Sequence, residues 1–131
     1  MITKEGSIAS SSVCLGKGYL QVETWYRGSS LKSTAKYTVR FSSNNGMVDE
    51  MMDFVKDFSR ANNFSVPAMD TRQVSDSGNG KTVDLLLSIT TNDRHSTDLI
   101  EQQMSRIGKA LEKEYFSPSS QMSLQFAMLR D

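Results

Sequence analysis

The stretch SDSGNGKTVDLLLSITT, residues 75–91, decides the fold because a tight turn is followed there by an alternating apolar run. Its GKT at 80–82 also closes phosphate-binding P-loops, but a P-loop needs a glycine where this chain has Ser75, and a helix directly afterwards. Instead, apolar side chains recur at every second position, the period of a half-buried strand: Val83, Leu85, Leu87 and Ile89. Asn79-Gly80 favours a two-residue hairpin turn because both residues tolerate positive φ. The stretch therefore predicts a β-hairpin and not a nucleotide site.

Four further segments alternate or contain short apolar runs typical of strands. Residues 19–26 and 35–41 have a clean period of two and predict a long hairpin. A short strand is predicted over 64–68, and because Pro67 cannot donate a ladder hydrogen bond, it should lie at a sheet edge or carry an irregularity. A final strand is predicted over 122–128.

In two other segments the apolar residues recur with the spacing of a helix. The first places apolar side chains on one face, with acidic residues early and basic residues late: Val48, Met51, Met52, Val55 and Phe58. The second has the same spacing, and Ser96, Thr97 or Asp98 can cap its start: Ile100, Met104, Ile107 and Leu111. From Ser33 the order strand, helix, strand, strand, helix, strand predicts an α+β, ferredoxin-like βαββαβ two-layer sandwich with an extra N-terminal strand, ββαββαβ in all.

The chain length of 131 residues is that of one domain. Residues 1–12 are Ser-rich and unpatterned, so we expect a flexible N-terminal arm followed by a single α+β domain over 13–131. With 15 basic and 15 acidic side chains, no global field attracts nucleic acid or an anionic membrane. No apolar run approaches the length that spans a bilayer, and the N-terminus lacks the apolar core of a signal peptide. We therefore expect a cytoplasmic protein without membrane contact.

Residue types needed for chemistry are scarce in this sequence. Cys14 is the only cysteine and His95 the only histidine, which excludes an internal disulfide and argues against a soft-ligand metal site. No cofactor motif, glycine-framed serine or second histidine is present, so neither catalytic residues nor a cofactor are expected. A remote alternative is a small hydrolase centred on His95, with Asp93 orienting the imidazole.

The loop before the second helix is a candidate anion site. Backbone amides at a helix start, together with side chains that donate hydrogen bonds, can hold a phosphate or carboxylate. The residues concerned are Arg94, His95, Ser96 and Thr97. The simpler interpretation is a capped loop whose charges face water, because capping preference alone accounts for serine, threonine and aspartate here.

Apolar side chains on the polar side of the strands predict a binding surface. Tyr19, Trp25 and Leu86 share the parity opposite the core, close to Lys36 and Arg40. An exposed tryptophan beside tyrosine and arginine is typical of an interface anchor. We predict a non-enzymatic protein-binding module, an inhibitor, adaptor or chaperone-like factor. It acts through an aromatic-containing sheet face or edge and forms a homo-oligomer, a dimer. Small inhibitors from phages and mobile elements share this size and plain composition.

Two alternatives remain open for this face. It could bind single-stranded nucleic acid, with Lys36 and Arg40 on phosphates and Tyr19 and Trp25 stacking on bases, although Asp84 and Glu23 oppose this. The N-terminal arm could also dock on the face and cover it.

Overall fold

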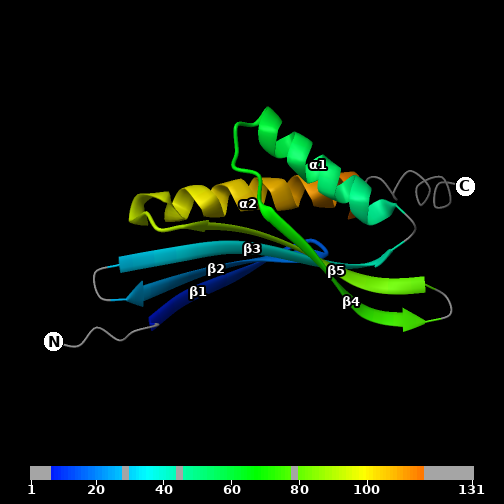
Figure 1. Ribbon diagram of the computed structural model, residues 1–131, viewed down its shortest axis with the longest axis horizontal. Coiled ribbons are helices and arrows are strands. Elements are labelled where there is room, and N and C mark those ends of the chain that lie inside the picture. Colours follow the sequence, from blue (N-terminus) through cyan, green and yellow to red (C-terminus); the bar gives the residue numbers. More distant parts are fainter. Residues whose placement is uncertain (1–6, 28–29, 44–45, 78–79, 117–131) are drawn as a thin grey trace, which may run out of the picture.

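The computed structural model of the protein describes residues 7–27, 30–43, 46–77 and 80–116, which form one five-stranded sheet and two helices on the same side of it (Figure 1). In chain order the strands and helices are β1 (Ser7–Leu15), β2 (Gly18–Arg27), β3 (Ser30–Ser43), α1 (Met47–Ala61), β4 (Ala68–Ser77), β5 (Gly80–Thr91) and α2 (Thr97–Leu111). A short 3-10 turn, Arg94–Ser96, precedes α2, and a single π-helical turn, Glu112–Phe116, follows it.

The strands lie in the order β1-β2-β3-β5-β4, and every neighbouring pair is antiparallel. β1, β2 and β3 are consecutive hairpins, so the first half of the sheet is a simple meander. Ser77 pairs with Gly80 across the β4–β5 hairpin, which confirms that two paired strands flank the predicted turn. Gly80, predicted as the second residue of that turn, is instead the first residue of β5. The turn residues 78–79 lie outside the described ranges. Since β5 continues directly after Thr82, the helix that a P-loop requires is not formed there.

The core lies between the sheet and α2. Alternate residues of β2, β3 and β5 face the helices, and the buried apolar side chains are Leu20, Val22, Ala35, Tyr37, Val39, Phe41, Val83, Leu85, Leu87 and Ile89. α2 contributes the residues of its predicted apolar face: Ile100, Met104, Ile107 and Leu111. The apolar side chains that recur every second residue in the strands therefore pack against those that recur every 3.6 residues in α2.

α1 packs against α2. Aromatic side chains also connect α1 to the turn Glu112–Phe116 that follows α2. Phe54 of α1 meets Tyr115 edge-on, with ring centroids 5.8 Å apart. Phe58 meets Phe64, which follows the helix, at 6.2 Å. Met51 and Val55 are fully buried on the same face of α1. This helix thus belongs to the covered side of the sheet, and the opposite side carries no helix among the described residues (Figure 1).

The prediction of a ferredoxin-like fold is wrong. β3 has β5 on one side, as predicted, but β2 on the other, which is the position that a ferredoxin-like final strand would need. The predicted extra N-terminal strand, β2, is therefore not an addition to a βαββαβ unit but a direct neighbour of β3. It is one of two meander strands, β1 and β2, that complete a five-stranded sheet of a different order. Residues 122–128, predicted as the last strand, lie outside the described residues.

Two strand boundaries also differ from the sequence predictions. Residues 7–12, expected in a flexible arm, belong to β1, because their backbone pairs with β2 from Ser7↔Tyr26 onward. The strand predicted over 64–68 instead begins at Ala68 and continues to Ser77. Pro67 lies immediately before it, where its missing N–H costs no ladder hydrogen bond. β4 lies at the edge of the sheet and has a register irregularity between Gln73 and Ser75.

Candidate functional site

The candidate site is the side of the sheet that faces away from α1 and α2, here called the outer face. Its described side chains alternate with the core positions and include Tyr19, Gln21, Glu23, Trp25, Lys32, Thr34, Lys36, Thr38, Arg40, Asp70, Arg72, Asp84, Leu86 and Ser88. Trp25 is 41% exposed and Tyr19 is 40% exposed. Two large aromatic side chains are therefore partly in water on a face that no described helix covers.

One row across the outer face brings three of the predicted residues close together. Tyr19 of β2 pairs with Thr38 of β3, and Thr38 pairs with Leu86 of β5. Thr38 is buried although it belongs to this face. Arg40 lies two residues further along β3 on the same face. Tyr19, Arg40 and Leu86 thus form one continuous patch.

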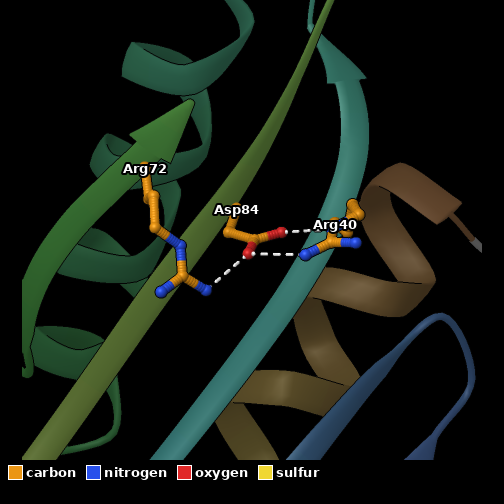
Figure 2. Close-up of polar contacts among 3 residues, drawn as sticks. All are labelled: Arg40, Arg72 and Asp84. Atoms are coloured by element: carbon orange, nitrogen blue, oxygen red, sulfur yellow. Dashed lines mark hydrogen bonds and ion pairs between the residues drawn. The ribbon is translucent and has the colours of Figure 1, made fainter. Parts of the chain in front are cut away.

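Asp84 lies beside this patch and is almost completely covered, although it belongs to the outer face. Figure 2 shows its carboxylate between two arginines from the neighbouring strands. Arg40 of β3 donates from Nε at 2.8 Å and from Nη2 at 3.2 Å, and Arg72 of β4 donates from Nη2 at 2.8 Å (Figure 2). The Asp84 side chain is only 2% exposed, while those of Arg40 and Arg72 are 59% and 63% exposed. The carboxylate is therefore buried beneath two guanidinium groups that remain open to solvent.

The two arginines change the acidity of the group between them. The hydrogen bond from Arg40 lowers the pKa of Asp84, and Arg72 adds to this, while burial acts in the opposite direction. The hydrogen bond to Asp84 in turn raises the pKa of Arg40, with a smaller contribution from Tyr19. Asp84 is therefore ionised at neutral pH and holds both guanidinium groups in place.

The remaining predicted outer-face residues lie further along the strands. Lys36 forms an ion pair with Glu23, with Nζ and Oε1 3.1 Å apart. Trp25 is six residues from Tyr19 on β2, about 20 Å along an extended strand, and pairs with Lys32. The five predicted residues thus share one face, but Trp25 stands apart from the patch around Tyr19.

The candidate anion site before α2 already contains a carboxylate from the chain itself. Asp93 accepts a hydrogen bond from the backbone N–H of His95 at 3.0 Å and one from the Ser96 hydroxyl at 2.9 Å. These bonds, the one from His95 foremost, lower the pKa of Asp93. The Thr97 hydroxyl lies 2.9 Å from that of Ser33 in the core. An external anion would therefore have to displace Asp93; the Arg94 side chain lies outside what the structure describes.

The carboxylate of Glu112 connects the end of α2 to the β1–β2 turn and to β3. Glu112, just after α2, accepts hydrogen bonds from the backbone N–H groups of Lys17 and Gly18 at 2.9 and 2.8 Å, and from the hydroxyl of Tyr37. Burial, followed by the bond to Glu112, raises the pKa of Tyr37. All the donors here come from the protein, so this cluster is best explained as a clamp that holds α2 on the sheet.

Sequence reasoning missed the role of Arg72. Asp84 appeared only as a charge that opposes nucleic-acid binding, because residues 72–77 were not assigned to a strand. Once β4 pairs with β5, Arg72 lies directly opposite Asp84. The signal that could have found it is the hairpin itself, since extending both strands from the turn brings an arginine next to an aspartate.

Within residues 7–27, 30–43, 46–77 and 80–116, no three His, Cys, Asp or Glu side chains gather as a metal ion would require. None of the helices in the described part of the chain is long and apolar enough to cross a membrane. Comparison of the chain with models of protein families, with curated proteins and with solved structures gives no match.

Proposed function

We propose that this protein is a non-enzymatic protein-binding module, an inhibitor, adaptor or chaperone-like factor, whose partner contacts the outer face. The observation that carries the proposal is the combination of Trp25 and Tyr19, each about two fifths exposed, on a sheet face without a described helix. Aromatic side chains that are partly in water gain apolar contacts when a partner covers them, and tryptophan, tyrosine and arginine are the residues that most often anchor protein interfaces.

The charges of the outer face favour a protein partner over a polyanion. Arg40 and Arg72 share Asp84, and Lys36 pairs with Glu23. Nucleic-acid binding uses basic groups that are free to neutralise phosphates, and each of these three already faces a carboxylate. The two guanidinium groups still expose further N–H donors. Because Asp84 fixes their positions, they can donate to carbonyl or carboxylate oxygens of a protein without losing much conformational entropy.

A cytoplasmic location is part of the same proposal. Cys14 is exposed and is the only cysteine of the sequence. An exposed thiol without a partner cysteine in its own chain suits a reducing compartment.

The experiment is a comparative capture from extracts of the cells that produce the protein. The bait proteins are the wild type, a Tyr19→Ala/Trp25→Ala variant, and a control Leu99→Ala. The control removes an apolar side chain of α2 that is 51% exposed and lies on the other side of the sheet. The expected result is a protein that binds the wild type and Leu99→Ala but not the double variant. Titration calorimetry with that purified protein should show similar affinities for the wild type and Leu99→Ala, and a much weaker affinity for the double variant. Equal retention by all three baits would contradict the proposal.

Nucleic acid is tested in parallel with fluorescently labelled single-stranded oligonucleotides. We expect that the wild type does not bind these oligonucleotides through Lys36 and Arg40. The charge reversals Lys36→Glu and Arg40→Glu should therefore leave the fluorescence signal unchanged. Tight binding that falls steeply with salt and disappears in these variants would replace the protein-binding proposal with the nucleic-acid alternative.

A further inference from the structure

The two edges of the sheet are protected to different degrees. β4 carries charged residues, follows Pro67 and has an irregular register between Gln73 and Ser75. Such features prevent an edge strand from pairing with another chain. β1, with the sequence SIASSSVCL, has neither charge nor proline, and its register with β2 is unbroken over all nine residues. The β1 edge therefore lacks the protection that the β4 edge has.

The exposed surface of β1 agrees with this difference. Residues 10–14 are all exposed, and Val13 is 50% exposed although it lies on the core parity, opposite Leu20. Among the described strands, β1 pairs only with β2. Its second row of backbone N–H and C=O groups is therefore not used by the described sheet, and a further extended strand could satisfy it.

We propose that two copies of the chain pair through β1, antiparallel, about a two-fold axis at Ser11. The argument for a second copy is that β1 is complementary to itself. Pairing about its central residue uses all nine positions and sets Ala9 opposite Val13, Ile8 opposite Cys14, and Ser10 opposite Ser12. Three of the four pairs beside the axis then match in polarity, the terminal pair sets Ser7 opposite Leu15, and no like charges oppose each other. Such an interface has the same residues on both sides and closes as a dimer.

This dimer goes beyond the proposed function and does not depend on it. Edge pairing lies in the plane of the sheet, so it leaves the outer face uncovered and joins the outer faces of the two copies into one larger surface. Self-association and partner binding thus use different parts of the protein.

The first test is the mass of the full chain by sedimentation equilibrium. We expect a concentration-dependent mass near twice 14.6 kDa for the wild type. Ser11→Asp sets two carboxylates against each other at the axis and should give a monomer. Ser75→Asp places the same change on the exposed β4 edge and should leave the dimer intact. Far-ultraviolet circular dichroism verifies that both variants fold.

Three outcomes overturn the proposal. One is a wild type that stays monomeric up to its highest soluble concentration. Another is a dimer that Ser11→Asp does not weaken. The third is a dimer that is lost in folded Trp25→Ala, since this result would place the contact on the outer face. None of these results decides whether the outer face binds a partner, which the capture experiment measures separately.

The second test fixes the register with a disulfide. In the proposed pairing, Ile8→Cys stands opposite Cys14 of the second copy, at a separation that a disulfide spans. Within one chain the two positions are six residues apart on a strand, about 20 Å, so they cannot join to each other. Mild oxidation of Ile8→Cys should therefore give a covalent dimer on non-reducing gels. Ser10→Cys, two positions out of register, should give far less. Equal cross-linking of both variants, or of neither, would contradict the pairing about Ser11.

Discussion

Arg40 of β3 and Asp84 of β5 occupy directly paired positions, and the guanidinium group grips both oxygens of the carboxylate, at 2.8 and 3.2 Å (Figure 2). Two-point contacts of this kind are among the stronger hydrogen bonds in proteins and fix the planes of both groups. Because Arg72 reaches the same carboxylate from β4, Asp84 links three adjacent strands on the outer face.

Asp84→Asn removes the charge and should lower the free energy of unfolding at pH 7 by about 1–2 kcal/mol, a value reduced by the exposure of both arginines. The pKa of Asp84 is lowered in the folded protein, so as the pH falls the unfolded chain takes up this proton first. The stabilisation is therefore complete above the ordinary carboxyl pKa of about 3.9 and is lost as the pH falls through the folded-state pKa. Urea titrations at pH 7 and pH 3 measure both effects.

The matched control for this change is Asp70→Asn, which alters an exposed carboxylate on the outer face of β4. It should shift the urea midpoint little. The cluster has no stabilising role if Asp84→Asn unfolds at the wild-type urea concentration at pH 7, or if the difference between the two proteins does not shrink at pH 3.

Tyr37→Phe tests the clamp at Glu112. The Tyr37 hydroxyl is buried and donates to the Glu112 carboxylate, which the Lys17 and Gly18 amides also bind. Removing this donor should cost about 1–2 kcal/mol of stability, because the carboxylate loses a partner while no apolar surface is gained. Tyr19→Phe, at an exposed position, should change the urea midpoint little. Equal midpoints for the two variants would show that the clamp contributes nothing.

Gly108→Ala tests how closely α2 approaches the sheet. A Cβ at Gly108 would lie 2.9 Å from Cδ1 and Cε1 of Tyr37 and 3.1 Å from Cδ1 of Leu15. Alanine favours a helix over glycine by about 1 kcal/mol, but overpacking a buried contact costs about 1–3 kcal/mol. Since Glu112 holds the Tyr37 ring, we expect overpacking to prevail and the urea midpoint to fall. A variant more stable than the wild type would mean that α2 and Tyr37 separate easily.

The helix control is Gln102→Ala, an exposed position of α2. It changes helix propensity without touching the sheet, so thermal and urea unfolding should stay close to the wild type.

Trp25 reports directly on whether the outer face is open. It is the only tryptophan and is 41% exposed. Its emission should be red-shifted relative to a buried indole, and acrylamide should quench it substantially in the native protein. The unfolded protein in urea supplies the upper limit for quenching. Blue-shifted emission with negligible quenching would mean that another part of the chain covers this face.

The sequence predicts those parts of the fold whose side chains alternate strongly. β2, β3 and β5 each bury one apolar row, and α1 and α2 each bury one apolar stripe, so their periods are visible without a structure. The parity that puts Tyr19, Trp25 and Leu86 opposite the core follows from the same alternation. Candidate residues on the outer face could therefore be named from the sequence.

β1 and β4 could not be predicted in the same way. The serines of β1 bury little apolar surface, so the strand forms through backbone pairing with β2, which leaves no periodic signal. β4 continues past its apolar start through residues 70–77, which are polar except for Val74 and resemble a loop in sequence. Strand order was the larger error, because the partner of an extended segment depends on the whole sheet. The contact between Arg72 and Asp84 has a different cause: it lies within the β4–β5 hairpin and is visible only when residues 72–77 are assigned to a strand.

The most direct test of the account is to map partner contact on the isotope-labelled protein by nuclear magnetic resonance, using the protein retained in the capture experiment. Amide signals of outer-face residues on β2, β3 and β5, Tyr19, Trp25, Arg40 and Leu86 among them, should shift or broaden during the titration, while those of the exposed face of α2, such as Leu99, stay in place. Shifts confined to α1 and α2, with the outer-face signals unchanged, would contradict it.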